Sequence, residues 1–242
     1  MFNKTPFISI IFRKSGAGVM NETAELQSVL VQSKRYLCLF LFIPLLSLVH
    51  SKSIDDELWT GIELKKKISS TIKLKVEQQL RLKEHFSQFH KTFTDFSLSY
   101  KVSPIVKLTG KYRYIVYEDK VKSRISLGSK IDLETNYFLT SYRFRLQREF
   151  ERNEPPEDME LRNKFTLGYP LIKQFTPYIS YEFFHILKDE SLSYNKFRIG
   201  LGMEYEINED KSLEIYCLYK GEFVKSEIEV TNIIGLQYGY SF

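Results

Sequence analysis

The last twelve residues, Thr231–Phe242, alternate in polarity from Ile234 onward and end on an aromatic side chain. From Gly235 onward the odd positions are small or polar, whereas the even positions are apolar or aromatic, namely Ile234, Leu236, Tyr238, Tyr240 and Phe242. A period of two indicates a β-strand with one apolar and one polar face. A soluble protein would normally bury or blunt such a strand, whereas a transmembrane β-barrel turns the apolar face to lipid and places aromatic residues at the membrane surface. The strand therefore favours a membrane barrel, although a core strand of a soluble sandwich also alternates.

The same alternation recurs from Leu58 onward, in segments that are separated by turns. These segments run roughly 10–13 residues, which suits a tilted membrane strand and exceeds the usual soluble strand of about 5–6. We predict strands at Leu58–Ile68, Ile72–Leu82, Phe93–Val102, Val106–Tyr117, Val121–Leu133, Asn136–Gln147, Leu161–Tyr169, Thr176–Phe184, Phe197–Tyr205, Leu213–Lys220 and Thr231–Phe242.

The connections between these strands are predicted to alternate in length. Short turns are expected near Ser69, Ser103, Glu134, Ile172–Gln174 and Asn208, and longer loops between them, at Glu84–Thr92, Arg148–Asp158, Lys188–Asn195 and Gly221–Val230. Short periplasmic turns and longer outer loops are typical of bacterial barrels. The odd count of strands does not fit, because a single-chain barrel with both ends in the periplasm usually has an even number. Either a strand was missed or the Trp59 segment enters the lumen, so we predict about 10–12 strands.

Composition agrees with a barrel rather than with a bundle of membrane helices. Hydrophobic residues make up 43% of the 242 residues, aromatic residues 15%, and the mean hydropathy is −0.27. A helical membrane protein would need several runs of about 20 apolar residues. A barrel does not, because its polar lumen dilutes its lipid-facing half.

One long apolar run, Tyr36–Val49, follows Lys34 and Arg35. Its length falls within the range of about 7–15 residues that is usual for the apolar core of a secretory signal peptide. We therefore predict that residues 1–51 are a signal peptide, cleaved near Ser51–Lys52, and that residues 52–242 form the barrel. Residues 1–19 are surplus to such a signal, and Met20 is an alternative start. An uncleaved anchor or a buried helix is the other interpretation.

Charge and cysteine content exclude two further classes. Residues 52–242 hold 30 basic and 28 acidic residues, which is too balanced for a nucleic-acid-binding protein. Cys38 falls in the predicted signal and Cys217 remains alone, so no disulfide framework and no cysteine-based metal site is expected.

A series of short motifs resembles one known family. They are Leu58-Trp59, Val76–Arg81, Leu98–Tyr100, Lys111–Tyr114, Ser123–Ile125, Tyr142–Arg145, Leu161–Lys164, Tyr181-Glu182 and the aromatic carboxy end. In this order they resemble the outer-membrane barrels grouped as domain of unknown function 2490, over about Leu58–Phe242. The resemblance implies an outer-membrane barrel without an assigned activity, and it implies no catalytic residues.

The predicted inward face of the strands is rich in cations. We expect the following side chains to line the lumen: Glu77, Arg81, Lys111, Arg113, Arg124, Arg143, Arg145, Arg162, Glu182, Arg198 and Glu204. One interpretation is a set of ion pairs that fills and rigidifies a small barrel. The other is a pore that favours anions, because rings of Arg and Lys select them.

An enzyme that acts on lipid is the alternative function. Such an enzyme needs a His or a carboxylate pair beside a nucleophile, and no recognisable arrangement of this kind occurs. His85 and His90 could bind a metal, and Glu77 with Glu182 could form a carboxylate pair, but we expect the two carboxylates to pair with Arg81 and Arg113 instead. We therefore predict no catalytic site, no metal and no cofactor.

Two other side chains are assigned from their positions. Trp59 is expected to anchor at the membrane interface, which is commoner than plugging the lumen. Cys217 should face lipid.

Taken together, the sequence predicts an all-β, up-and-down antiparallel transmembrane barrel in the outer membrane of a Gram-negative bacterium. Its partners would be outer-membrane lipid and the barrel-assembly machinery, which would read Tyr238, Tyr240 and Phe242 as its signal; no nucleic acid is expected, and the oligomeric state is left open. Its role would be that of a passive small channel, anion-favouring or not, or of a structural barrel.

Overall fold

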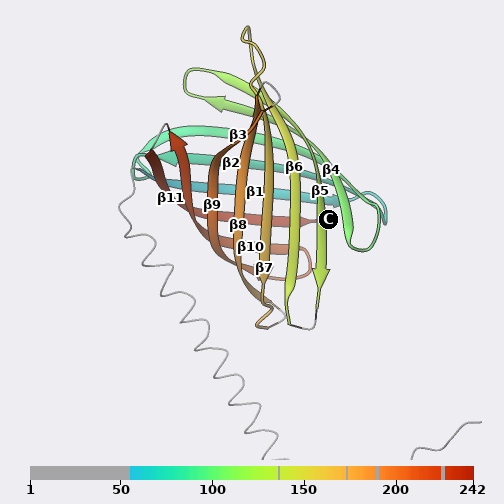
Figure 1. Ribbon diagram of the computed structural model, residues 1–242. Helices are drawn as coiled ribbons and strands as arrows, with labels where there is room; N and C mark the ends of the chain where they lie inside the picture. The colour runs from blue at the N-terminus through green and yellow to red at the C-terminus, as the bar shows by residue number, and fades with distance from the viewer. Residues whose placement is uncertain (1–54, 136, 173, 189–190, 225–226) are drawn as a thin grey trace, which may run out of the picture. The chain divides into compact units, whose positions relative to one another are not determined.

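The computed structural model describes residues 55–135, 137–172, 174–188, 191–224 and 227–242, and the predicted signal peptide lies outside them. Eleven strands form one closed barrel (Figure 1). No helix among the described residues is long and apolar enough to cross a membrane. The strands are β1 (Asp55–Lys67), β2 (Ile72–Lys83), β3 (Gln88–Lys101), β4 (Val106–Tyr117), β5 (Val121–Glu134), β6 (Leu139–Glu151), β7 (Met159–Gly168), β8 (Phe175–Lys188), β9 (Ser191–Glu206), β10 (Lys211–Val224) and β11 (Glu227–Ser241).

Each strand pairs antiparallel with its neighbours in sequence, and the barrel closes where β1 pairs parallel with β11. The register at this closure runs from Asp55 opposite Thr231 to Lys65 opposite Ser241. The predicted up-and-down barrel of about 10–12 strands is confirmed. Both explanations of the odd count were wrong, because the Trp59 segment is wall strand β1 and the described residues hold eleven strands. An up-and-down barrel with an odd number of strands must close with a parallel pair, since its first and last strands run in the same direction.

Because β1 and β11 run in the same direction, β1 begins at one rim of the barrel and β11 finishes at the other. We call the end at which β11 finishes the Phe242 rim; it carries the connections 68–71, 102–105, 135–138, 169–174 and 207–210. There the backbone N–H of Phe242 donates to the carbonyl oxygen of Lys65 at 2.9 Å. The opposite end, where β1 begins, is the Asp55 rim.

The expectation of longer loops at the Asp55 rim was wrong. The described connections there are residues 84–87, 118–120 and 152–158, and two of these three are as short as most of those at the opposite rim. Strand pairing continues through most of the predicted loops, as far as Lys188 opposite Ser191 and Val224 opposite Glu227. The alternation of apolar and polar residues ends in these segments because a hairpin that extends beyond the membrane has water on both faces. The backbone hydrogen bonds between its strands do not depend on that alternation and continue.

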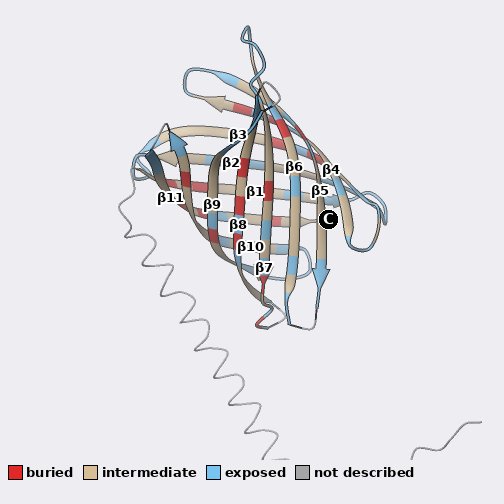
Figure 2. Cartoon of the chain, viewed as in Figure 1, coloured by how far each residue is buried: buried red, intermediate tan, exposed pale blue. Residues whose placement is uncertain are grey.

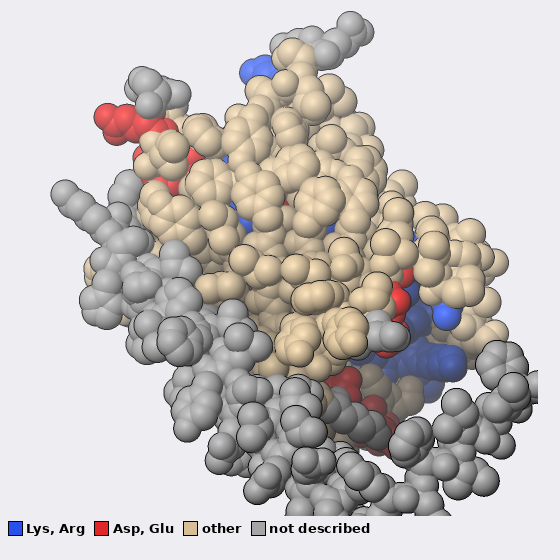
Figure 3. All heavy atoms as spheres, turned by 60° about the horizontal axis from the view of Figure 1, so that its bottom comes forward, with Lys and Arg blue, Asp and Glu red and all other residues tan. Residues whose placement is uncertain are grey.

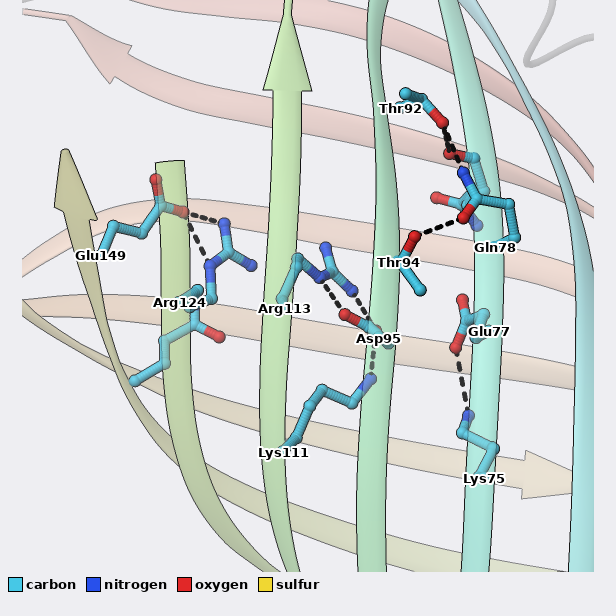
Figure 4. A network of polar contacts seen from close by, with 12 residues as sticks. Lys75, Glu77, Gln78, Thr92, Thr94, Asp95, Lys111, Arg113, Arg124 and Glu149 are labelled. Atoms are coloured by element: carbon cyan, nitrogen blue, oxygen red, sulfur yellow. Dashed lines mark hydrogen bonds and ion pairs between the residues drawn. The ribbon is translucent and has the colours of Figure 1, made fainter. Parts of the chain in front are cut away.

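The barrel is apolar outside and polar inside, as the alternation predicts. On β3, Phe96, Leu98 and Tyr100 are each about half exposed, whereas Asp95 on the same strand is completely buried. Figure 2 shows buried positions recurring along the strands between more exposed ones. Outward polar side chains satisfy one another, since Gln78 on β2 is hydrogen-bonded to both Thr92 and Thr94 on β3 (Figure 4). An apolar outer wall around a polar interior is the pattern of a membrane barrel.

Candidate functional site

The interior of the barrel contains a cavity of about 920 Å³ to which all eleven strands contribute side chains. Its lining holds eighteen Lys and Arg residues and eleven Asp and Glu residues. Figure 3 shows Lys and Arg side chains gathered in the hollow at the end that comes forward, with acidic side chains beside them. The eleven residues that the sequence predicts for the lumen all lie in this lining: Glu77, Arg81, Lys111, Arg113, Arg124, Arg143, Arg145, Arg162, Glu182, Arg198 and Glu204.

Asp95 is the centre of one group of ion pairs, between β3 and β4. Arg113 donates from Nε to Oδ1 at 2.6 Å and from a terminal nitrogen to Oδ2 at 2.7 Å, and the Lys111 ammonium donates to Oδ2 at 2.6 Å (Figure 4). Asp95 has no exposed surface. Two cations thus neutralise one buried carboxylate, and the group keeps a net positive charge.

Glu182 on β8 is the centre of a second group. It accepts from Arg162 on β7 at 2.9 Å and from Arg143 on β6 at 3.1 Å, and it lies 3.6 Å from Arg198 on β9. Three guanidinium groups share this carboxylate, which is 5% exposed. A third group joins Arg124 on β5 to Glu149 on β6 (Figure 4).

The expected pairing of Glu77 and Glu182 with Arg81 and Arg113 was wrong. Glu77 pairs with Lys75, two residues away on its own strand, at 3.1 Å. Arg113 pairs with Asp95, directly opposite it on β3. Arg81 donates to Gln79 at 2.8 Å and has no ion-pair partner among the described residues. The alternation within each strand places these side chains on the inner face, but the register between neighbouring strands determines which of them are in contact.

Arginine side chains alternate with aromatic rings along part of the inner wall. Measured from the guanidinium carbon to the ring centroid, Arg113 lies 3.5 Å from Phe93, and Arg81 lies 3.4 Å from Trp59 and 5.0 Å from Phe93. On the other side of Trp59, Arg198 lies 5.3 Å from Trp59 and 4.8 Å from Phe184, and Arg162 lies 4.7 Å from Phe184. We call these seven residues the arginine–aromatic belt. Cation–π contacts of this kind hold guanidinium groups in place without neutralising them.

Trp59 therefore does not anchor at the membrane interface. Its side chain lies inside the barrel, 5% exposed, and its indole nitrogen donates to Glu57 at 2.6 Å. The parity of its own strand indicates this position, because Leu58, Ile62 and Leu64 alternate with it and face outward. Phe93 and Phe184 also lie on the inner wall, where they were not predicted, although they share the parity of Asp95 and Glu182.

The polar contacts of the inner wall run around the lumen rather than across it. Most ion pairs join the same strand, adjacent strands or strands that are two apart, such as Lys196 on β9 with Glu160 on β7 at 2.9 Å. The widest described contact, Arg198 with Trp59, spans β9 to β1. Among the described residues, no ion pair or hydrogen bond joins opposite walls, so the charged network borders the cavity.

The histidines occupy separate places. His85 contacts Asp56 at 3.0 Å, His90 lies 3.6 Å from Glu57, and His185 packs against Phe183 and Tyr194. Within the described ranges, no group of three or more His, Cys, Asp and Glu residues is arranged to hold a metal ion. Cys217 alternates with the lumen-lining Tyr216 and Leu218 on β10.

Residues 56–231 match the family described as "Protein of unknown function (DUF2490)". The chain belongs to this family. The predicted resemblance is thereby confirmed over most of the barrel, and the family description assigns no activity. None of the curated proteins matches this DUF2490 chain.

Several solved β-barrels are similar to this DUF2490 protein at low sequence identity. The KdgM porin in complex with disordered oligogalacturonate has 13% identity and a TM-score of 0.45, covering 78% of this chain and 99% of its own. The NanC porin has 10% identity and a TM-score of 0.45, covering 67% and 86%. The β domain of the Bordetella autotransporter BrkA has 12% identity and a TM-score of 0.43, covering 73% and 86%. At this level the likeness assigns no activity to the DUF2490 barrel.

Proposed function

We propose that the protein is an integral barrel of the outer membrane of a Gram-negative bacterium and forms a small channel that favours anions. The apolar outer wall supports the membrane location. The excess of cations in the cavity supports the anion preference: eighteen basic against eleven acidic residues border one space of about 920 Å³. Rings of Arg and Lys lower the energy of an anion inside a narrow pore and raise that of a cation.

The course of the polar contacts favours a water-containing lumen over a filled one. In a filled barrel, side chains from opposite walls would meet at the axis. Here the contacts of the described residues follow the wall, and the belt holds its arginines against rings on the same or nearby strands. The cations are therefore held at the margin of the cavity, where they can act on a solute.

The test is the reversal potential of the refolded protein in a planar bilayer under a salt gradient, after folding has been checked by the gel shift between boiled and unboiled samples. We expect a steady conductance with a reversal potential that favours chloride over potassium. A folded barrel without conductance would reject the channel and leave a structural barrel. A cation preference would reject the role given to the lining. The prediction that no catalytic site exists is separate and is tested by assaying the same sample on phospholipid.

A further inference from the structure

Four cations of β6 and β7 face each other directly on the inner wall. The register places Arg145 opposite Arg162 and Arg143 opposite Lys164. We call these four residues the cation square. Like charges directly opposite each other on an antiparallel pair are destabilising. Two such pairs in succession therefore need a compensating negative charge.

The chain supplies only part of that charge. Glu182, opposite Lys164 on β8, pairs with Arg143 and Arg162, and it also lies 3.6 Å from Arg198 outside the square. Arg145 and Lys164 form no ion pair or hydrogen bond with any residue that the structure describes, although both line the cavity. The Nε of Arg162 is buried and has no hydrogen-bond partner among the described residues. Glu182 thus pairs with three cations, and Arg145 and Lys164 remain without an ion-pair partner among the described residues.

The cavity extends to Arg145 on the side of β5. The residue opposite Arg145 there is Gly128, which lines the cavity without a side chain. A Cβ atom at Gly128 would lie 2.6 Å from the carbonyl oxygen of Phe144, so glycine is required by the close approach of the two strands. Ser126 and Lys111 line the same region. Arg145, Gly128, Ser126 and Lys111 therefore border one cavity, and its lining here offers hydroxyl and cationic donors.

We infer that the cation square binds a small multivalent oxyanion with the chemistry of phosphate. Guanidinium groups donate paired hydrogen bonds to phosphate oxygens, and a lysine beside them adds charge. A tetrahedral dianion offers separate oxygen atoms for paired hydrogen bonds with the guanidinium groups, and it carries twice the charge of chloride. The inference deepens the proposed channel, since the ligand reaches the square through the lumen.

Binding is tested on the refolded barrel in nonionic detergent, without reliance on conductance. Thermal unfolding, followed by the gel shift, is measured in sodium phosphate and in sodium chloride at equal ionic strength. We expect phosphate to raise the midpoint above its value in chloride, with a saturable dependence on concentration. A midpoint that is equal in the two salts would overturn the site.

Two lysines provide the matched comparison. Lys164 belongs to the square, whereas Lys73 on β2 lines the same cavity, and neither forms an ion pair within the described ranges. We expect K164S and R145S each to weaken phosphate binding at least tenfold, R145K to restore part of it, and K73S to leave it within about twofold. An equal loss in K73S would show general attraction to the lumen and would reject the square.

A phosphorylated lipid is the other source of the same chemistry. Detergent micelles that contain phosphatidic acid would then stabilise the barrel while inorganic phosphate would not, which would reject a lumen site for a solute. The two proposals also fail separately. If the folded barrel does not conduct but is stabilised by phosphate, the binding site at the cation square stands and the channel is rejected. If the barrel is anion-selective but phosphate has no effect on its unfolding midpoint, the channel stands and the binding site is rejected.

Discussion

Asp95 and Arg113 face each other across β3 and β4 and form a doubly hydrogen-bonded ion pair at 2.6 and 2.7 Å, with the carboxylate wholly buried. Lys111 is a second partner, at 2.6 Å. The pair lies within the wall of a polar interior, so its two charges depend on each other more than on water.

Replacing Asp95 by Asn should lower the free energy of unfolding by about 3–5 kcal/mol, because it leaves two cations without their counter-charge in a buried position. The measurement is denaturant unfolding of the refolded barrel in detergent. Asp132 is the control, since it also contacts two lysines but its side chain is 42% exposed. D132N should cost less than about 1 kcal/mol. Equal effects of D95N and D132N would mean that burial of the Asp95 pair does not matter to the fold.

Trp59 is the only tryptophan of the chain and lies in the arginine–aromatic belt, so its fluorescence reports on the lumen. We expect iodide to quench it more strongly than caesium, because the cations around it attract anions. R81S should reduce that difference, since it removes the guanidinium group 3.4 Å from the ring centroid. Neutral acrylamide serves as the control for accessibility. Strong quenching by brominated lipid, with none by iodide, would instead place Trp59 at the membrane interface.

Arg143 and Arg145 should differ when each is replaced by Ser. Arg145 has no ion-pair partner among the described residues, whereas Arg143 pairs with Glu182 at 3.1 Å. R145S should therefore reduce the anion preference in the bilayer measurement with little change in stability. R143S should cost more stability, although Glu182 keeps Arg162 and Arg198. The reverse order, with R145S the less stable variant, would contradict the assignment of Arg145 to the open cavity.

The parallel closure predicts which ends of the chain share a side of the membrane. In a C217S background, D55C and N153C, both at the Asp55 rim, should react alike with a membrane-impermeant maleimide on intact cells. E209C, at the Phe242 rim, should react only after the outer membrane is permeabilised. If E209C reacted on intact cells and D55C and N153C reacted only after permeabilisation, the strand topology would stand but the barrel would be inserted in the opposite orientation. If D55C reacted like E209C, the parallel pairing of β1 and β11 would be wrong.

Much of the fold could be predicted from the sequence because side-chain parity is a local property. Val106–Tyr117 was predicted with the bounds of β4, and the alternation of each strand placed Arg113 and Glu182 on the inner wall. Partners could not be predicted in this way. Asp95 contacts Arg113 because of the register between β3 and β4. The alternation within each strand does not specify that register.

Closure and contact across several strands were beyond local reasoning as well. Arg198 reaches Trp59 from β9 to β1, over residues that are far apart in the chain. The predicted loops failed for a different reason, since at Lys188–Asn195 the polarity pattern ended before the backbone pairing did. The general preference of tryptophan for the membrane interface predicted the wrong place for Trp59, whereas the parity of its own strand indicates the lumen.

Ten of the eleven strands form five hairpins that join at the Asp55 rim, from β2–β3 to β10–β11, and β1 is the strand left over. Besides β2, its partner is β11, which follows the other ten strands in the chain, and the register pairs Asp55 with Thr231. Contacts between residues so distant in sequence form late in folding, because the entropic cost of closing a long loop comes before the contacts can stabilise it. The first strand of the barrel therefore lacks its second neighbour until β11 is in place, and a chain without β11 would be an open sheet with two free edges.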